Sequence, residues 1–124
     1  NAEAMQRLEA IVHPLAGAAQ QGFRQSARAS GAHFAVIDIP LLFEKSSQSE
    51  FDATLLVTAP ADLQRKRVLA RPGMTEAQFQ SILARQMPDT EKRSLATHIV
   101  ETLDLPSAQA YVTALIAHIR NPHA

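Results

Sequence analysis

The chain has 124 residues, of which 46% are hydrophobic, and its twelve Lys and Arg balance its twelve Asp and Glu. This composition excludes a disordered chain and fits one compact soluble domain with a modest core. Without a basic excess, we expect no binding to nucleic acid and none to an acidic membrane surface. The absence of cysteine excludes disulfides and thiolate sites and is compatible with a reducing cytoplasm, the location that we expect.

Residues 2–29 have the pattern of one long helix, because apolar side chains recur at steps of three and four between Met5 and Phe23. Pro14 lies inside this pattern and predicts a bend or a break near His13. Gly31 suits the left-handed position that ends many helices.

Three short runs of branched and apolar residues predict β-strands at 33–39, 53–58 and 97–101. Three helices are predicted between the second and third strands: one opened by Pro60 and running to about Arg71, one at 75–85, and a short one from Pro88. A final helix, ending at Ile119, is predicted after the third strand. The second of these helices begins with the capping-box spacing Thr75–Gln78. Strands that alternate with helices indicate an α/β fold with a parallel sheet.

We interpret residues 1–124 as a single partial domain with four segments. These are a helical substrate-side segment (1–32), the core strands (33–59), a helix and lid (60–95), and a last strand with the C-terminal helix (96–124). Three strands are few for a buried parallel sheet, and residue 1 already lies in a helical pattern. We therefore expect that further chain precedes it.

Asp38 and Glu44 flank the most informative stretch, because Asp38 ends a predicted strand and Glu44 follows shortly after. In parallel α/β sheets the carboxyl ends of the strands form the ligand crevice. The two carboxylates there could orient Mg²⁺ through water or bind a ligand hydroxyl. Alternatively, Asp38 caps a turn and Glu44 is solvated.

The stretch Asp38-Ile39-Pro40-Leu41-Leu42-Phe43-Glu44 resembles the signature of the dephospho-CoA kinases. Three further elements follow the order of that family: His13-Pro14 on the first helix, the segment 59–67 with its Gln-x-x-Arg, and the lid segment 71–88. Together these cover nearly the whole chain.

The resemblance implies a P-loop kinase fold: a parallel three-layer α/β sheet with helical CoA-side and lid segments, incomplete in this chain. It also implies transfer of phosphate from ATP, with Mg²⁺, to the ribose 3′-hydroxyl of dephospho-CoA. On matching positions, His13, Phe43 and Glu44 would face dephospho-CoA, while Arg71 and Arg85 would reach the ATP phosphates from the lid. Arg71 would stabilise the transition state. Asp38, by its place at the end of the predicted strand, would contact the metal through water.

Each of these residues also has a structural interpretation. His13 could be a packed or capping histidine, and Phe43 could belong to the core. Arg71 could neutralise the C-terminal end of its helix. The adenine contact is open, because Glu101-Thr102 stand where the family has an Asp-Asn turn.

No G-x-x-x-x-G-K-[ST] occurs in the chain, since none of its four glycines precedes a lysine in that way. We expect this phosphate-binding loop and the catalytic acid upstream, and we predict that these residues alone are inactive. Two alternatives remain: a non-catalytic module that binds CoA or an adenine nucleotide, and another small-molecule kinase such as a nucleoside monophosphate kinase.

Overall fold

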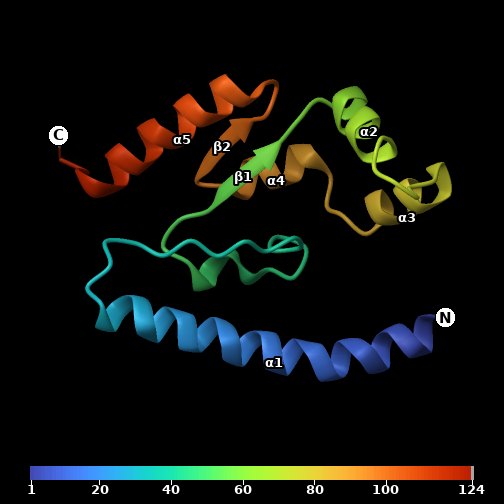
Figure 1. The fold of residues 1–124 in the computed structure, drawn as a ribbon, viewed down its shortest axis with the longest axis horizontal. Coiled ribbons are helices and arrows are strands. Elements are labelled where there is room, and N and C mark those ends of the chain that lie inside the picture. Colours follow the sequence, from blue (N-terminus) through green and yellow to red (C-terminus); the bar gives the residue numbers. More distant parts are fainter. Residues whose placement is uncertain (124) are drawn as a thin grey trace. The chain divides into compact units, whose positions relative to one another are not determined.

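The computed structural model describes residues 1–123, which fall into two units, with the boundary between Asp38 and Ile39. The first unit contains α1 (Ala2–Ala29), followed by an extended segment (Figure 1). Asn1 caps the start of α1, because its side-chain oxygen accepts a hydrogen bond of 3.0 Å from the Glu3 N–H. The predicted first helix is therefore confirmed with the same bounds.

The end of α1 has a defined geometry around Gly31, whose φ of 70° is left-handed. The N–H of Gly31 donates to the Arg28 carbonyl, and the N–H of Ala32 donates to the Ala27 carbonyl. This pair of bonds is the Schellman motif, which requires a residue that tolerates positive φ. The prediction for Gly31 is confirmed.

The predicted break at Pro14 does not occur, since α1 continues through it without interruption, and the alternative of a bend stays a prediction. Proline removes one N–H from the helix and leaves the Ala10 carbonyl without its usual donor. No side chain of α1 is buried, so water can satisfy that carbonyl.

The predicted strand at 33–39 is also wrong, because this segment belongs to no sheet among the described residues. The apolar, branched composition is that of a strand, but a strand also needs a partner for its backbone groups. The segment has no such partner in residues 1–123.

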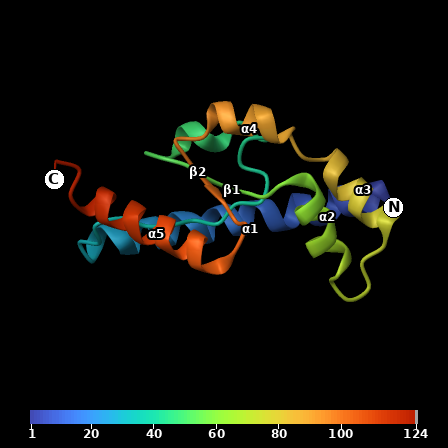
Figure 2. The ribbon, with the colours of Figure 1, turned by 90° about the horizontal axis from the view of Figure 1, so that it is seen from above.

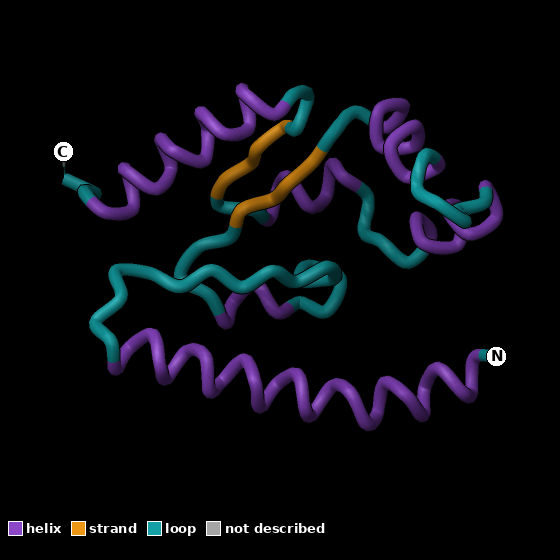
Figure 3. The backbone as a smooth tube through the Cα atoms, in the orientation of Figure 1, coloured by secondary structure: helices purple, strands orange, loops and turns teal. Residues whose placement is uncertain are grey.

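The second unit is built on two parallel strands, β1 (Leu55–Thr58) and β2 (His98–Glu101), shown in orange in Figure 3. Leu56 pairs with Ile99, and Thr58 at the end of β1 pairs with Glu101 at the end of β2. The buried apolar side chains of this unit are Phe43, Leu56, Phe79 and Val100. Both strands match predicted ones, shortened at their starts.

Helices cover both faces of this sheet. The short helix α4 (Asp89–Leu95) contacts β1, and α5 (Leu105–Arg120) contacts β2. The two views in Figures 1 and 2 place α4 and α5 on opposite faces, with the strands between them. The predicted α/β fold with a parallel sheet is thus confirmed, and a short 3₁₀ helix, η1 (Ser47–Glu50), precedes β1.

A pair of contacting helices, α2 (Ala61–Leu69) and α3 (Glu76–Ala84), follows the carboxyl end of β1 (Figure 1). The predicted capping box is present: Thr75 Oγ1 accepts from the Gln78 N–H, and the Gln78 side chain accepts from the Thr75 N–H. Among residues 1–123, no helix combines the length and the apolar character that a membrane crossing requires.

Candidate functional site

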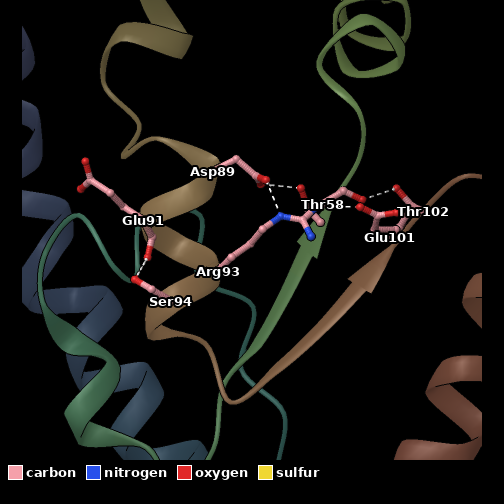
Figure 4. Close-up of polar contacts among 7 residues, drawn as sticks. All are labelled: Thr58, Asp89, Glu91, Arg93, Ser94, Glu101 and Thr102. Atoms are coloured by element: carbon pink, nitrogen blue, oxygen red, sulfur yellow. Dashed lines mark hydrogen bonds and ion pairs between the residues drawn. The ribbon is translucent and has the colours of Figure 1, made fainter.

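Polar side chains gather where β1 and β2 end. The Thr58 hydroxyl donates a hydrogen bond to the carboxylate of Asp89, the first residue of α4. The Thr102 hydroxyl, one residue beyond β2, donates to the Thr58 carbonyl at 3.1 Å (Figure 4). Because the carboxyl ends of parallel strands form the ligand crevice of α/β proteins, this edge is the candidate site.

Arg93 on α4 completes this arrangement by binding two carboxylates. Its Nε lies 2.6 Å from Asp89 Oδ2, and its Nη2 lies 2.7 Å from Glu101 Oε1 at the end of β2 (Figure 4). We call Thr58, Asp89, Arg93, Glu101 and Thr102 the strand-end network. Through it, α4 is joined to the ends of both strands.

Within this network, Asp89 and Arg93 each stabilise the charged form of the other. Burial raises the pKa of Asp89, but the hydrogen bonds from Thr58 and Arg93 and the positive charge of Arg93 outweigh it and hold that pKa below its ordinary value. Hydrogen bonds to Asp89 and Glu101 raise the pKa of Arg93. At neutral pH, Asp89 is therefore ionised and Arg93 is charged.

Arg67 connects α2 to the same edge of the sheet. Its Nη1 donates to Thr102 Oγ1 at 3.0 Å, and its Nη2 donates to the Leu103 carbonyl at 3.1 Å. The planar guanidinium can make both bonds at once because its N–H groups form a fixed fork. The last turns of α2 are thus held to the connection between β2 and α5.

A second polar group is centred on Glu44. Glu44 Oε2 accepts a hydrogen bond of 2.7 Å from the Met87 N–H, and it lies 3.3 Å from Lys92 Nζ. The side chains of Glu44 and Lys92 are only 12% and 14% exposed. We call Glu44, Met87 and Lys92 the Glu44 cluster; it joins the loop before η1 to the connection between α3 and α4.

The Glu44 cluster keeps its carboxylate ionised despite this burial. Burial raises the pKa of Glu44, but the Met87 N–H, the backbone N–H of Glu44 itself and the Lys92 ammonium together lower it below its ordinary value. A largely buried carboxylate without such partners would favour its neutral form instead.

The two predicted lid arginines both belong to the α2–α3 pair. Arg71 is exposed and follows α2 in a turn, where its carbonyl accepts from the Met74 N–H at 3.1 Å. Gly73 allows this turn with a φ of 75°. Arg85 is the residue that ends α3, two positions before Met87.

The remaining predicted site residues are divided between the two units. His13 in the middle of α1 and Asp38 belong to the first unit and are exposed. Phe43, in the second unit, is only 5% exposed and packs in the core. Its predicted contact with a substrate stays a prediction, as do those of His13 and Glu44.

No group of three His, Asp or Glu side chains within residues 1–123 is arranged to hold a metal ion. Asp38 is a single exposed carboxylate, and Asp89 and Glu101 already bind Arg93. The contact of Asp38 with Mg²⁺ through water therefore stays a prediction.

Most residues of the strand-end network were not predicted as site residues from the sequence. Thr58 and Glu101 end predicted strands, so their position was a usable signal for a site at the carboxyl edge. Asp89 and Arg93 have the i, i+4 spacing of a helical ion pair just after Pro88. No local sequence pattern indicates that Asp89 contacts the end of β1 or that Arg93 contacts the end of β2.

Comparison with known proteins assigns the family. The family model for dephospho-CoA kinase matches residues 1–104. The dephospho-CoA kinase of Cereibacter sphaeroides is 62% identical over 117 residues, covering 94% of this chain and 58% of that protein. Those of Mesorhizobium japonicum and Rhodopseudomonas palustris strain BisB18 are 50% and 46% identical, over 97% and 94% of this chain and 61% and 59% of their own lengths. The chain thus spans about three-fifths of these relatives, and it belongs to the dephospho-CoA kinase family.

Proposed function

We propose that the complete protein transfers the γ-phosphate of ATP to the ribose 3′-hydroxyl of dephospho-CoA. In this reaction the 3′-oxygen forms a bond to the γ-phosphorus, the bond from that phosphorus to the bridging oxygen of ADP breaks, and the hydroxyl proton is lost. Family membership supports the activity, and the placement of an Arg-bearing helix pair beyond the carboxyl end of β1 is the structural observation that carries it.

The two arginines of the α2–α3 pair suit this chemistry. Phosphoryl transfer spreads negative charge over the equatorial oxygens, so catalysis depends on positioning and on electrostatic stabilisation. Arg71 stands on an exposed turn and is the proposed transition-state stabiliser, with Arg85 as a second phosphate contact. Closure of the pair would also exclude water, which otherwise competes for the phosphate.

The substrate side is assigned to His13, Phe43 and Glu44 on the same family resemblance. The metal contact through water is assigned to Asp38 because of its place just before Pro40 in the expected ligand crevice. ATP with Mg²⁺ would be the phosphate donor. The cytoplasmic location likewise stays a prediction. The 124 residues contain no G-x-x-x-x-G-K-[ST], so we propose that they are inactive on their own.

A coupled assay of ADP release tests this function. The protein expressed from its complete gene is given ATP with dephospho-CoA or with AMP, and the 124-residue chain is assayed in parallel. We expect turnover of dephospho-CoA by the complete protein, none of AMP, and no ADP release by the shorter chain. Turnover of AMP alone would identify a nucleoside monophosphate kinase, and binding of dephospho-CoA without turnover would identify a binding module.

A further inference from the structure

Polar contacts hold the α2–α3 pair at two places, near the end of α2 and just beyond the end of α3. Near the end of α2, Arg67 is bonded to Thr102 and to the Leu103 carbonyl. Just beyond α3, the Met87 N–H is bonded to Glu44. The ion pair that joins the two helices to each other, Arg65 with Glu76, is about half exposed and so contributes little to rigidity.

The contact at Met87 is the more buried of the two. The Glu44 and Lys92 side chains are largely buried, and the Met87 N–H and the Lys92 ammonium both bind the same carboxylate oxygen, Glu44 Oε2. Phe43, the neighbour of Glu44 in sequence, is buried in the core and fixes the backbone from which Glu44 extends. The carboxylate is therefore held on a rigid base.

Beyond Met87, the chain is fixed to the sheet. Asp89 begins α4 and accepts from Thr58, and Arg93 binds Glu101. Met87 thus lies between a helix pair whose joining ion pair is exposed and a helix that is joined to both strands. A segment that moves as a unit needs such a boundary at a few residues between elements.

We propose that Glu44 is a positioning residue: through the Met87 N–H and Lys92, it fixes the end of the lid that carries Arg85. Glu44 Oε2 is already bound by groups of the chain itself, so this role replaces the direct contact with dephospho-CoA that the family resemblance implies for Glu44. The catalytic part of this inference rests on the proposed kinase function. The structural part does not.

The test combines amide exchange with kinetics in the complete protein. Glu44→Ala removes the acceptor of the Met87 N–H, and Lys92→Met removes only the cation at nearly the same length. Loss of a hydrogen bond to a charged acceptor should speed exchange of the Met87 amide about tenfold or more in Glu44→Ala, with a smaller increase in Lys92→Met. Glu91→Gln, at an exposed position on α4, is the matched control. It should change neither the exchange rate of the Met87 amide nor kcat.

In the kinetic experiment, we expect both variants to lower kcat, with little change in the KM for dephospho-CoA, since the end of the lid that carries Arg85 and not a substrate contact is displaced. Glu44→Asp should restore part of the loss if its shorter carboxylate still reaches Met87. Unchanged exchange at Met87, or an effect confined to the KM for dephospho-CoA, would overturn the proposal in favour of a direct substrate contact. If the complete protein has no kinase activity, the proposed function fails, and the exchange result alone then decides whether Glu44 holds Met87.

Discussion

Thr58, the last residue of β1, donates its hydroxyl hydrogen bond to Asp89, the first residue of α4, although 30 residues separate them in the chain. Thr58 is buried, with 8% of its surface exposed. The contact therefore seats the start of α4 at the carboxyl edge of the sheet.

Thr58→Val should destabilise the complete protein by about 1.5–3 kcal/mol, because it replaces a hydroxyl that is bonded to a charged acceptor by a methyl group of the same shape. The free energy of unfolding in urea measures this. Thr90→Val, at an exposed position on α4, is the control. Its free energy of unfolding should differ from that of the wild type by less than about 0.5 kcal/mol. Equal stability of the two variants would mean that the Thr58–Asp89 bond contributes nothing net.

Removal of the Arg93 guanidinium should lower the stability of the protein more than removal of either of its two carboxylate partners. In Arg93→Met, Asp89 and Glu101 keep their negative charges and lose the cation between them. The urea midpoint should fall, and Glu101→Gln in the same protein should restore part of it. Because Arg93 is partly exposed, the loss should shrink in 1 M salt, where the Debye length is about 3 Å. An effect of Arg93→Met that does not depend on salt would contradict an electrostatic cause.

Acid should weaken the Glu44 cluster in a defined direction. The pKa of Glu44 is lowered from its ordinary value of 4.5, so its ionised form is stabilised by folding. That stability is complete above the ordinary value and is lost as the pH falls through the lower pKa of the folded protein. Unfolding free energies at pH 7, 5, 4 and 3 should show a smaller acid loss in Glu44→Gln than in wild type. Glu50→Gln, an exposed glutamate of the same unit, should follow wild type at every pH.

Local signals predicted most of the elements. The capping box at Thr75–Gln78, the glycine at 31 and the prolines that precede α2 and α4 each act within a few residues, so the sequence is enough to find them. The same reasoning failed at residues 33–39, whose composition is that of a strand. Strand formation depends on a partner from elsewhere in the chain, and no local pattern reports whether one is present.

The candidate site was less accessible to sequence reasoning because it is made of long-range contacts. Glu44 and Met87 are 43 residues apart, and Arg67 and Thr102 are 35 apart. The family resemblance singled out Glu44, but not the groups that bind its carboxylate. Those partners follow only from how α4 packs on the strands.

Arg71 offers a direct test of the proposed chemistry in the lid. It is exposed, so Arg71→Ala should change the free energy of unfolding by less than about 0.5 kcal/mol. If its guanidinium stabilises the charge that develops on the transferred phosphate, kcat should fall by about 10²-fold, the usual effect of losing one such donor. Lys should rescue only part of the loss, because an ammonium cannot bind two phosphate oxygens in the same plane.

Arg120→Ala, near the end of α5, is the control for loss of an exposed arginine and should keep full turnover. Steady-state assays with ATP and dephospho-CoA varied separately would show whether Arg71 acts on the chemical step or on binding. A loss confined to the KM for ATP would make Arg71 a ground-state contact with the phosphates. An unchanged kcat and KM would leave Arg71 only the role of a positive charge at the C-terminal end of α2, where it would favour the helix without taking part in the reaction.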